Sequence, residues 1–214
     1  MRGVSIGIDV GTTSITTAAV KTDKSGKPRL LAAAKSPSRG VRRGTVNDNG
    51  ELALAIKASV AEASKTSGVR IKSAVVGFSG AGAASSISRG VIAVTRADGE
   101  ITAEDVKRVM QAAEALSPKN PNREIIHMIP RSYGVDHEGG IKDPIGMVGM
   151  RLEVDALIID AQKLALQNLV KAFEAAEIEV EDWLFSPIAA SEVVLSQRQK
   201  ELGVMLLDLG AGTS

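Results

Sequence analysis

The sequence contains no cysteine among its 214 residues. It therefore has neither a disulfide scaffold nor thiol chemistry, as fits a reducing cytosol. Only 2% of its residues are aromatic, so alanine, valine, isoleucine and leucine must form most of the core. Its 26 basic and 25 acidic residues nearly cancel, which gives no sign of a nucleic-acid or acidic-substrate partner. No stretch resembles a signal peptide or a membrane span, because glycines break the longest uncharged run, 73–88.

Near its start the sequence contains a strand, a turn rich in glycine and hydroxyls, and a returning strand. Ile6, Ile8 and Val10 alternate as in a strand, and a β-branched run over 15–20 follows the turn. The turn offers the carboxylate of Asp9, then Gly11 and three consecutive hydroxyl residues, 12–14. Backbone N–H groups around such a turn can bind an anion, and a carboxylate can hold a hydrated divalent cation against it. Plain hairpins also contain Asp-x-Gly-Thr, so this motif alone is ambiguous.

The last twelve residues, 203–214, repeat the pattern. An apolar strand is expected over 203–209, with Asp208 near its end, followed by Gly210, Ala211, Gly212 and Thr213. Two such turns in one chain suggest half-sites that close on one polyphosphate from opposite sides. In this respect the sequence resembles the superfamily of actin-like proteins, Hsp70 and sugar kinases. The resemblance implies ATP and Mg²⁺ as cofactors, with the phosphates held by Gly11, Thr12, Thr13, Gly210, Ala211, Gly212 and Thr213, and the metal held through water by Asp9 and Asp208.

Between the turns, the first third of the chain has an α/β pattern. We expect a strand over 29–34, a helix over 48–67 that ends at Gly68, and a buried strand over 72–77. Leu52, Ile56, Val60 and Ala63 fall on one face of that helix. The basic stretch 35–46 could bind an anion or a membrane surface, but a solvated loop is the simpler interpretation and the one that we adopt.

From about Ala84 the pattern changes to a strand–helix–strand–strand set. Strands are expected over 88–95, 124–135 and 150–159, and a helix begins after Thr102, a good N-cap. A second helix is expected over 161–176, with Leu166, Val170 and Phe173 facing inward. A strand through Val180 and Trp183 follows. Ser186 then suits an N-cap, with the next residue, a proline, at the first helical position.

Four segments make the sequence similar to the FtsA family of bacterial actin-like division proteins: 36–41 (Ser-Pro-Ser-Arg-Gly-Val), 141–147 (Ile-Lys-Asp-Pro-Ile-Gly-Met), 152–154 and 166–170. The resemblance covers 6–214. It implies an α/β, ribonuclease H-like actin subdomain (1A) formed by 1–83 and 161–200. A small α+β subdomain (1C, the SHS2 domain) is inserted at 84–160, and 201–214 begins a subdomain (2A) that we expect to continue beyond this chain.

The resemblance also implies a cytoplasmic scaffold at the inner face of the membrane at the division site. Such a protein associates with itself through 1A and 1C and recruits later division proteins through 84–160. It binds FtsZ and the membrane through parts expected to lie outside this chain, the latter a C-terminal helix. Ser186 occupies a position that orients the attacking water in relatives, where FtsA commonly has glutamine, and serine is a poor base, so we expect slow ATP hydrolysis at most. Ala211 stands where the family usually has glycine, and we expect weakened nucleotide binding.

Two alternatives share the same fold. A sugar kinase would have the first hairpin but would lack an insertion like 88–159, and an actin-like adaptor of pilus or plasmid machinery would differ only in its partner. The fold alone does not separate these functions. We further expect this chain by itself to bind nucleotide weakly or not at all and to be inactive.

Overall fold

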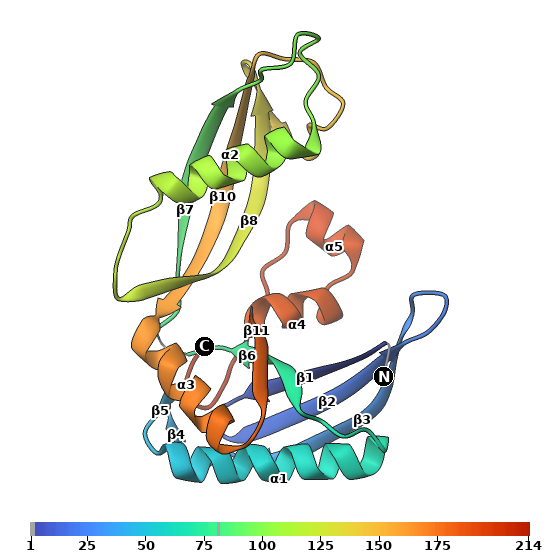
Figure 1. The fold of residues 1–214 in the computed structure, drawn as a ribbon, viewed down its shortest axis with the longest axis vertical. Helices are drawn as coiled ribbons and strands as arrows, with labels where there is room; N and C mark the ends of the chain where they lie inside the picture. The colour runs from blue at the N-terminus through green and yellow to red at the C-terminus, as the bar shows by residue number, and fades with distance from the viewer. Residues whose placement is uncertain (1–2, 81) are drawn as a thin grey trace. The chain divides into compact units, whose positions relative to one another are not determined.

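The computed structural model describes residues 3–80 and 82–214. The chain forms two compact units (Figure 1). The first unit comprises 1–83 and 162–214, and the inserted unit comprises 84–161.

The first unit contains a mixed five-stranded sheet with the strand order β11-β6-β1-β2-β3. The bounds are β1 Val4–Val10, β2 Ser14–Thr22, β3 Pro28–Pro37, β6 Ser73–Phe78 and β11 Glu179–Phe185. β1 is antiparallel to β2, and β2 to β3, so these three strands form a meander. β6 runs parallel to both β1 and β11, which requires crossover connections. The expected hairpin at the start of the chain is confirmed.

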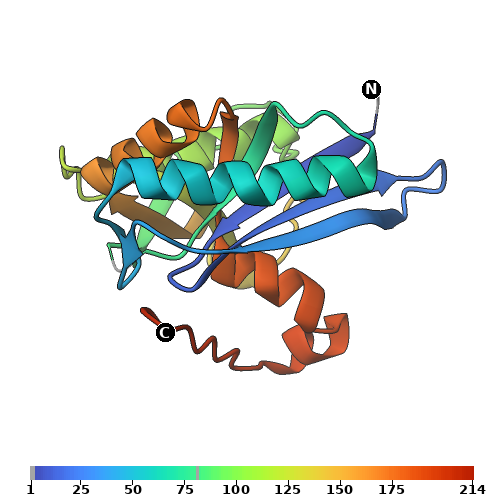
Figure 2. The ribbon, with the colours of Figure 1, turned by 90° about the horizontal axis from the view of Figure 1, so that it is seen from below.

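Helices α1 (Asn49–Ser67) and α3 (Lys163–Ala175) pack side by side on one face of this sheet (Figure 2). Asp48 caps α1 by accepting from the Glu51 N–H at 3.0 Å, and Gly68 ends it with φ 68°. All four apolar residues predicted for the inner face of α1 are buried. On α3, Leu166 and Phe173 are buried as predicted, whereas Val170, also predicted to face inward, is only half-buried. The helix begins two residues later than predicted, and the buried stripe runs 166, 169, 172 and 173.

Buried and more exposed side chains alternate along β1 and β2, so the two faces of the sheet differ. Ile8, Val10 and Ile15 are buried on the α1 side, and each such burial stabilises the fold by roughly 1.5–3 kcal/mol. Gly7 and Asp9 project to the opposite face. There α4 (Ser186–Val194) contacts β6 and β11, and α5 (Gln197–Leu202) follows it (Figure 2). Residues 203–209 do not pair with any described strand, so the strand predicted there is wrong.

A two-stranded hairpin, β4 (Val41–Arg42) with β5 (Thr45–Val46), lies within the basic stretch predicted to be a solvated loop. Its turn is Arg43-Gly44, and both turn residues have positive φ, 50° and 69°. The structure therefore gives this stretch a defined shape, which the sequence did not predict.

The inserted unit is a four-stranded sheet with the order β7-β10-β8-β9, and α2 covers one face (Figure 1). The bounds are β7 Ala84–Ala93, α2 Ala103–Leu116, β8 Arg123–Val135, β9 Glu138–Ile141 and β10 Arg151–Gln162. A Cβ on Gly90 would lie 2.1 Å from the Val109 carbonyl oxygen, so only glycine lets α2 approach β7 this closely. The core beneath α2 includes Ile101, Val109, Leu152 and Val154.

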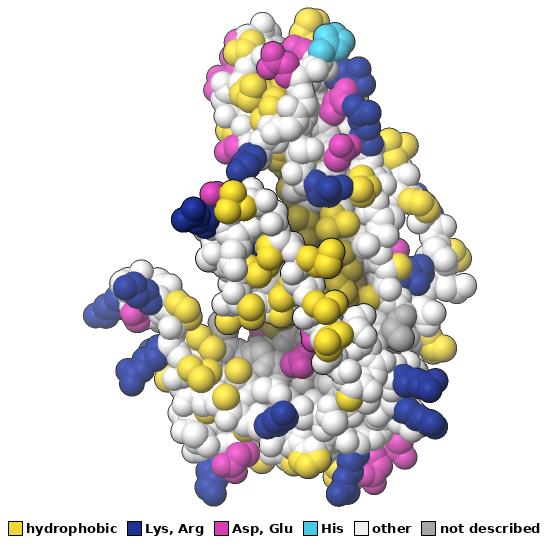
Figure 3. All heavy atoms as spheres, turned by 180° about the vertical axis from the view of Figure 1, so that it is seen from behind, with side chains coloured by type: hydrophobic (Ala, Val, Ile, Leu, Met, Phe, Trp, Pro, Cys, Tyr) yellow, Lys and Arg dark blue, Asp and Glu magenta, His cyan; other side chains and the backbone are white. Residues whose placement is uncertain are grey.

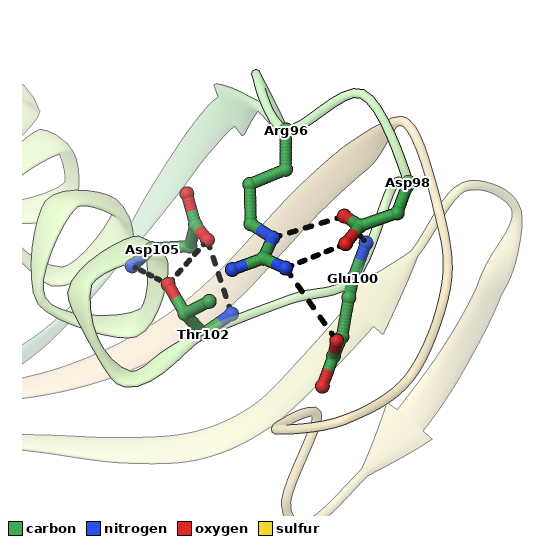
Figure 4. Close-up of polar contacts among 5 residues, drawn as sticks. All are labelled: Arg96, Asp98, Glu100, Thr102 and Asp105. Atoms are coloured by element: carbon green, nitrogen blue, oxygen red, sulfur yellow. Dashed lines mark hydrogen bonds and ion pairs between the residues drawn. The ribbon is translucent and has the colours of Figure 1, made fainter.

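The start of α2 is held by a capping box, shown in Figure 4. Thr102 accepts from the Asp105 N–H, and the Asp105 carboxylate accepts from both the backbone and the hydroxyl of Thr102. These bonds from Thr102, together with the charge of Arg108, lower the pKa of Asp105. In the turn before the helix, Arg96 forks onto Asp98 at 2.9 and 2.5 Å. This contact holds the Asp98 pKa well below its usual value.

Candidate functional site

The first glycine–hydroxyl turn, residues 11–14, closes the β1–β2 hairpin. The Gly11 N–H donates to the Ser14 carbonyl at 3.0 Å, and a Cβ on Gly11 would approach that same carbonyl to 3.0 Å. The Thr13 carbonyl accepts from the Ser38 N–H at 2.9 Å, which ties the turn to the end of β3. The turn is therefore fixed at both sides, by β1 and β2 and by the chain after β3.

The second turn, residues 210–213, closes in the same way. The Gly210 N–H donates to the Thr213 carbonyl at 3.0 Å, and a Cβ on Gly210 would lie 2.8 Å from that carbonyl oxygen. The Ala211 side chain is exposed, and its predicted effect on phosphate stays a prediction. The two turns thus share their local geometry although they lie nearly two hundred residues apart.

The two turns meet in space. A Cβ on Gly212 would lie 2.5 Å from Thr12 Oγ1 and 2.8 Å from the Arg43 Cα. Thr12 Oγ1 also accepts from the Gly44 N–H at 3.2 Å, so the β4–β5 hairpin touches the first turn as well. The backbone at Gly212 therefore fits against Thr12 only because it has no side chain.

The carboxylates of the two turns share one cavity. A cavity of about 530 Å³ is lined by Asp9 and Asp208 together with Ser186, and this volume lies within the range of small-ligand sites. Its remaining walls are small or apolar side chains of the sheet and α4, among them Ala18, Val20, Leu184, Ala189 and Ala190. Apolar side chains gather on this side of the first unit (Figure 3). The α4 alanines were not among the site residues predicted from the sequence.

Ser186 has a different role from the one predicted. The N-cap of α4 is Phe185, and Ser186 is already the first helical residue, so its side chain does not cap the helix. Its Oγ instead donates to Asp9 Oδ1 at 2.8 Å. A Cβ on Gly77 would lie 2.7 Å from that carboxylate oxygen and 2.9 Å from Ser186 Oγ. The pair therefore depends on the open space at Gly77.

The charge of the cavity limits what it can bind. Its lining contains two carboxylates and neither lysine nor arginine. Such a cavity would repel a bare polyphosphate, whereas carboxylate oxygens suit a hard divalent cation that keeps most of its waters. Among the described residues, no group of three or more acidic or histidine side chains gathers as a self-sufficient metal site. The donor set therefore fits a hydrated Mg²⁺ that completes its coordination with water and with its ligand.

Comparison with known proteins shows which proteins the chain is similar to. The family described as "SHS2 domain inserted in FTSA" matches residues 80–160. The "Cell division protein FtsA" of Streptococcus pneumoniae is 36% identical over 99% of this chain, and that of Borreliella burgdorferi is 37% identical over all of it. Over nearly its whole length the chain is therefore similar to part of FtsA, and residues 80–160 match the SHS2 domain that is inserted in FtsA. It covers 46% of the first FtsA relative and 51% of the second, which is about half of each length.

The fold is that of actin-like proteins with the SHS2 unit of FtsA inserted. A solved "PilM-PilN type IV pilus biogenesis complex" contains a chain that matches with a TM-score of 0.61 at 18% identity, over 88% of this chain and 49% of that one. This likeness concerns the fold alone. The similarity to FtsA proteins supports a division-related actin-like protein. None of the helices among its described residues is both long and apolar enough to cross a bilayer.

Proposed function

We propose that the chain is the nucleotide-binding part of a bacterial division scaffold and holds ATP with Mg²⁺ at its two glycine–hydroxyl turns. One observation carries this proposal: Asp9 and Asp208 line one cavity, and the turns behind them touch at Thr12 and Gly212. Backbone N–H groups at residues 11–13 and 210–213 would bind the phosphates. The metal would offset the negative charge that the phosphates and the two carboxylates bring together.

The test compares the complete gene product, expressed with any residues that follow Ser214, with its Asp9→Asn and Asp208→Asn variants. Binding of a fluorescent ATP analogue is titrated with and without Mg²⁺. We expect each variant to lose most of the Mg²⁺-dependent part of the affinity, since a neutral amide is a weaker ligand for a hard cation. Glu62→Gln, which removes an exposed carboxylate on α1, is the matched control. Unchanged affinity in both Asp variants would contradict the proposal.

Hydrolysis is proposed to be slow. Ser186 is too weakly basic to activate water, and its hydroxyl proton is already donated to Asp9. ATP binding should therefore be measurable under conditions in which phosphate release is barely above background. A fast, Mg²⁺-dependent release of phosphate by the complete protein would contradict this part. The SHS2 insertion disfavours the sugar-kinase alternative, because that function would leave residues 80–160 unexplained.

The partners are proposed from the family. In the complete protein, the scaffold would link FtsZ to the inner face of the cell membrane, associate with itself and recruit later division proteins through the inserted unit. Co-pelleting of the complete protein with FtsZ filaments tests the first link and separates this function from that of a pilus or plasmid adaptor. A deletion of 84–161 should leave FtsZ co-pelleting intact but remove binding of later division proteins.

A further inference from the structure

The turn of the β4–β5 hairpin has an unexpected residue at its most restrictive position. Two-residue hairpins of this shape need positive φ at both turn positions, which favours Asn-Gly or Gly-Gly. Here Gly44 meets that need, but the preceding position is Arg43, with φ 50°. Residues other than glycine rarely adopt this backbone conformation, and arginine is not among the residue types that tolerate it best. When such strain is held in place by its surroundings, it points to a functional reason for the side chain.

This strained turn lies against both glycine–hydroxyl turns. The Gly44 N–H donates to Thr12 Oγ1 at 3.2 Å. A Cβ placed on Gly212 would lie 2.8 Å from the Arg43 Cα. A Cβ on Gly80 would likewise lie 3.0 Å from the Gly44 carbonyl oxygen. Arg43 is therefore anchored where the two turns meet, and its side chain is exposed.

Within the described part of the chain, the cavity has no positively charged side chain, whereas Arg43 has a guanidinium group that is not used in an ion pair. The cavity lining includes no basic residue. Among the described residues, Arg43 forms no ion pair, whereas Arg39 in the same basic stretch pairs with Glu51 at 3.8 Å. An unpaired guanidinium next to an anion site can form two parallel hydrogen bonds to a phosphate.

We propose that Arg43 is a phosphate-binding residue of this site, which donates from its guanidinium to the nucleotide phosphates. The proposal rests on the proposed function and adds to it a positive charge, the guanidinium of Arg43 in the β4–β5 hairpin, that would pair with the phosphates. It also explains the strained turn: the chain keeps arginine where asparagine would fit the backbone better, because the charge is used when the ligand binds.

The decisive variant is Arg43→Asn in the complete gene product. Asparagine tolerates positive φ, so thermal unfolding should show a turn that is as stable as in the wild type or more so. Affinity for the ATP analogue should nevertheless fall about tenfold, as when a charge-assisted hydrogen bond is lost. Binding of the variant should also become less sensitive to added salt, because one screened attraction is gone. Arg43→Lys should bind at an intermediate level, since it keeps the charge but not the fork.

Arg42→Asn is the matched control, because Arg42 is exposed, adjacent and pairs in the hairpin ladder, and the variant has the same net charge. It should bind within about twofold of the wild type, as expected for a solvent-screened charge that does not contact the ligand. Equal losses in the two variants would overturn the proposal, as would full affinity in Arg43→Asn. If the wild type itself bound no nucleotide, the proposed function would fail and this inference with it.

Discussion

The turn after Asp9 and the turn after Asp208 close with the same backbone hydrogen bond at the same length, yet only one of them ends a strand. β1, before the first turn, lies between β2 and β6, and its Ile8 side chain is 1% exposed. The matching segment before the second turn pairs with no described strand, and its Leu207 side chain is 70% exposed. A turn of four residues forms from local contacts, whereas a strand needs neighbours on its edges.

The largest contrast should be in stability, between Ile8→Ala and Leu207→Ala. The first variant removes a buried side chain beneath α1 and should lower the free energy of unfolding by about 3 kcal/mol. The second changes a side chain that is mostly exposed and should stay within about 0.5 kcal/mol of the wild type. Urea unfolding of the 214-residue chain, followed by circular dichroism, measures both. Similar losses in the two variants would mean that 203–209 is packed in solution.

A smaller contrast is expected between the two glycines that close the turns. In Gly11→Ala the new Cβ crowds the Ser14 carbonyl of a turn held by two strands, which should cost about 1.5 kcal/mol of unfolding free energy. In Gly210→Ala the crowding of Thr213 can relax, since no sheet fixes the segment before it. Its unfolding free energy should be nearly unchanged, while affinity for the nucleotide falls in the complete protein. A large loss of stability in Gly210→Ala would break the comparison.

The inserted unit provides a reference, because the capping residues that predict α2 lie at the start of a helix that also packs on a buried core. Thr102→Ala removes the capping box of α2 and should cost about 1 kcal/mol without affecting nucleotide affinity. Because the folded-state pKa of Asp105 is lowered, its contribution is present above the unfolded value, about 3.9, and is lost as the pH falls through the folded pKa. The stability difference between the wild type and Asp105→Asn should therefore shrink below about pH 4. A difference that stayed constant from pH 7 to pH 3 would contradict this.

The smallest effect concerns how the two carboxylates are held. Asp9 accepts a hydrogen bond from Ser186, whereas among the described residues no hydrogen bond to the Asp208 side chain is present. Ser186→Ala should change stability by no more than about 0.5 kcal/mol, because the bond is exposed. It should raise the Mg²⁺ concentration needed for half-maximal nucleotide binding a few-fold, and Ser186→Thr should restore it. Isothermal titration at several Mg²⁺ concentrations makes the measurement, and an unchanged requirement in Ser186→Ala would show that the bond does not position Asp9.

Much of the fold could be predicted from short patterns. The first hairpin, α1 with its glycine stop, and the Thr102 N-cap all depend on residues a few positions apart. A capping box at Ser196 and Gln199 marks α5 in the same way, although the sequence analysis overlooked it. The strand predicted over 203–209 was wrong. An apolar run favours an extended backbone, but it does not determine whether a neighbouring strand is available to pair with it. The N-cap predicted for Ser186 was wrong because Asp9 competes for its hydroxyl from 177 residues away.

By itself, the sequence determined the two glycine–hydroxyl turns and the caps of α1 and α2. These features arise from hydrogen bonds and backbone preferences within a few residues. Only the tertiary structure decided which side chains share the cavity, which turn is flanked by a sheet, and that the Arg43 hairpin lies where the two turns meet. Those outcomes depend on the space that Gly77 and Gly212 leave open, and whether a missing Cβ matters is settled only when distant segments come together.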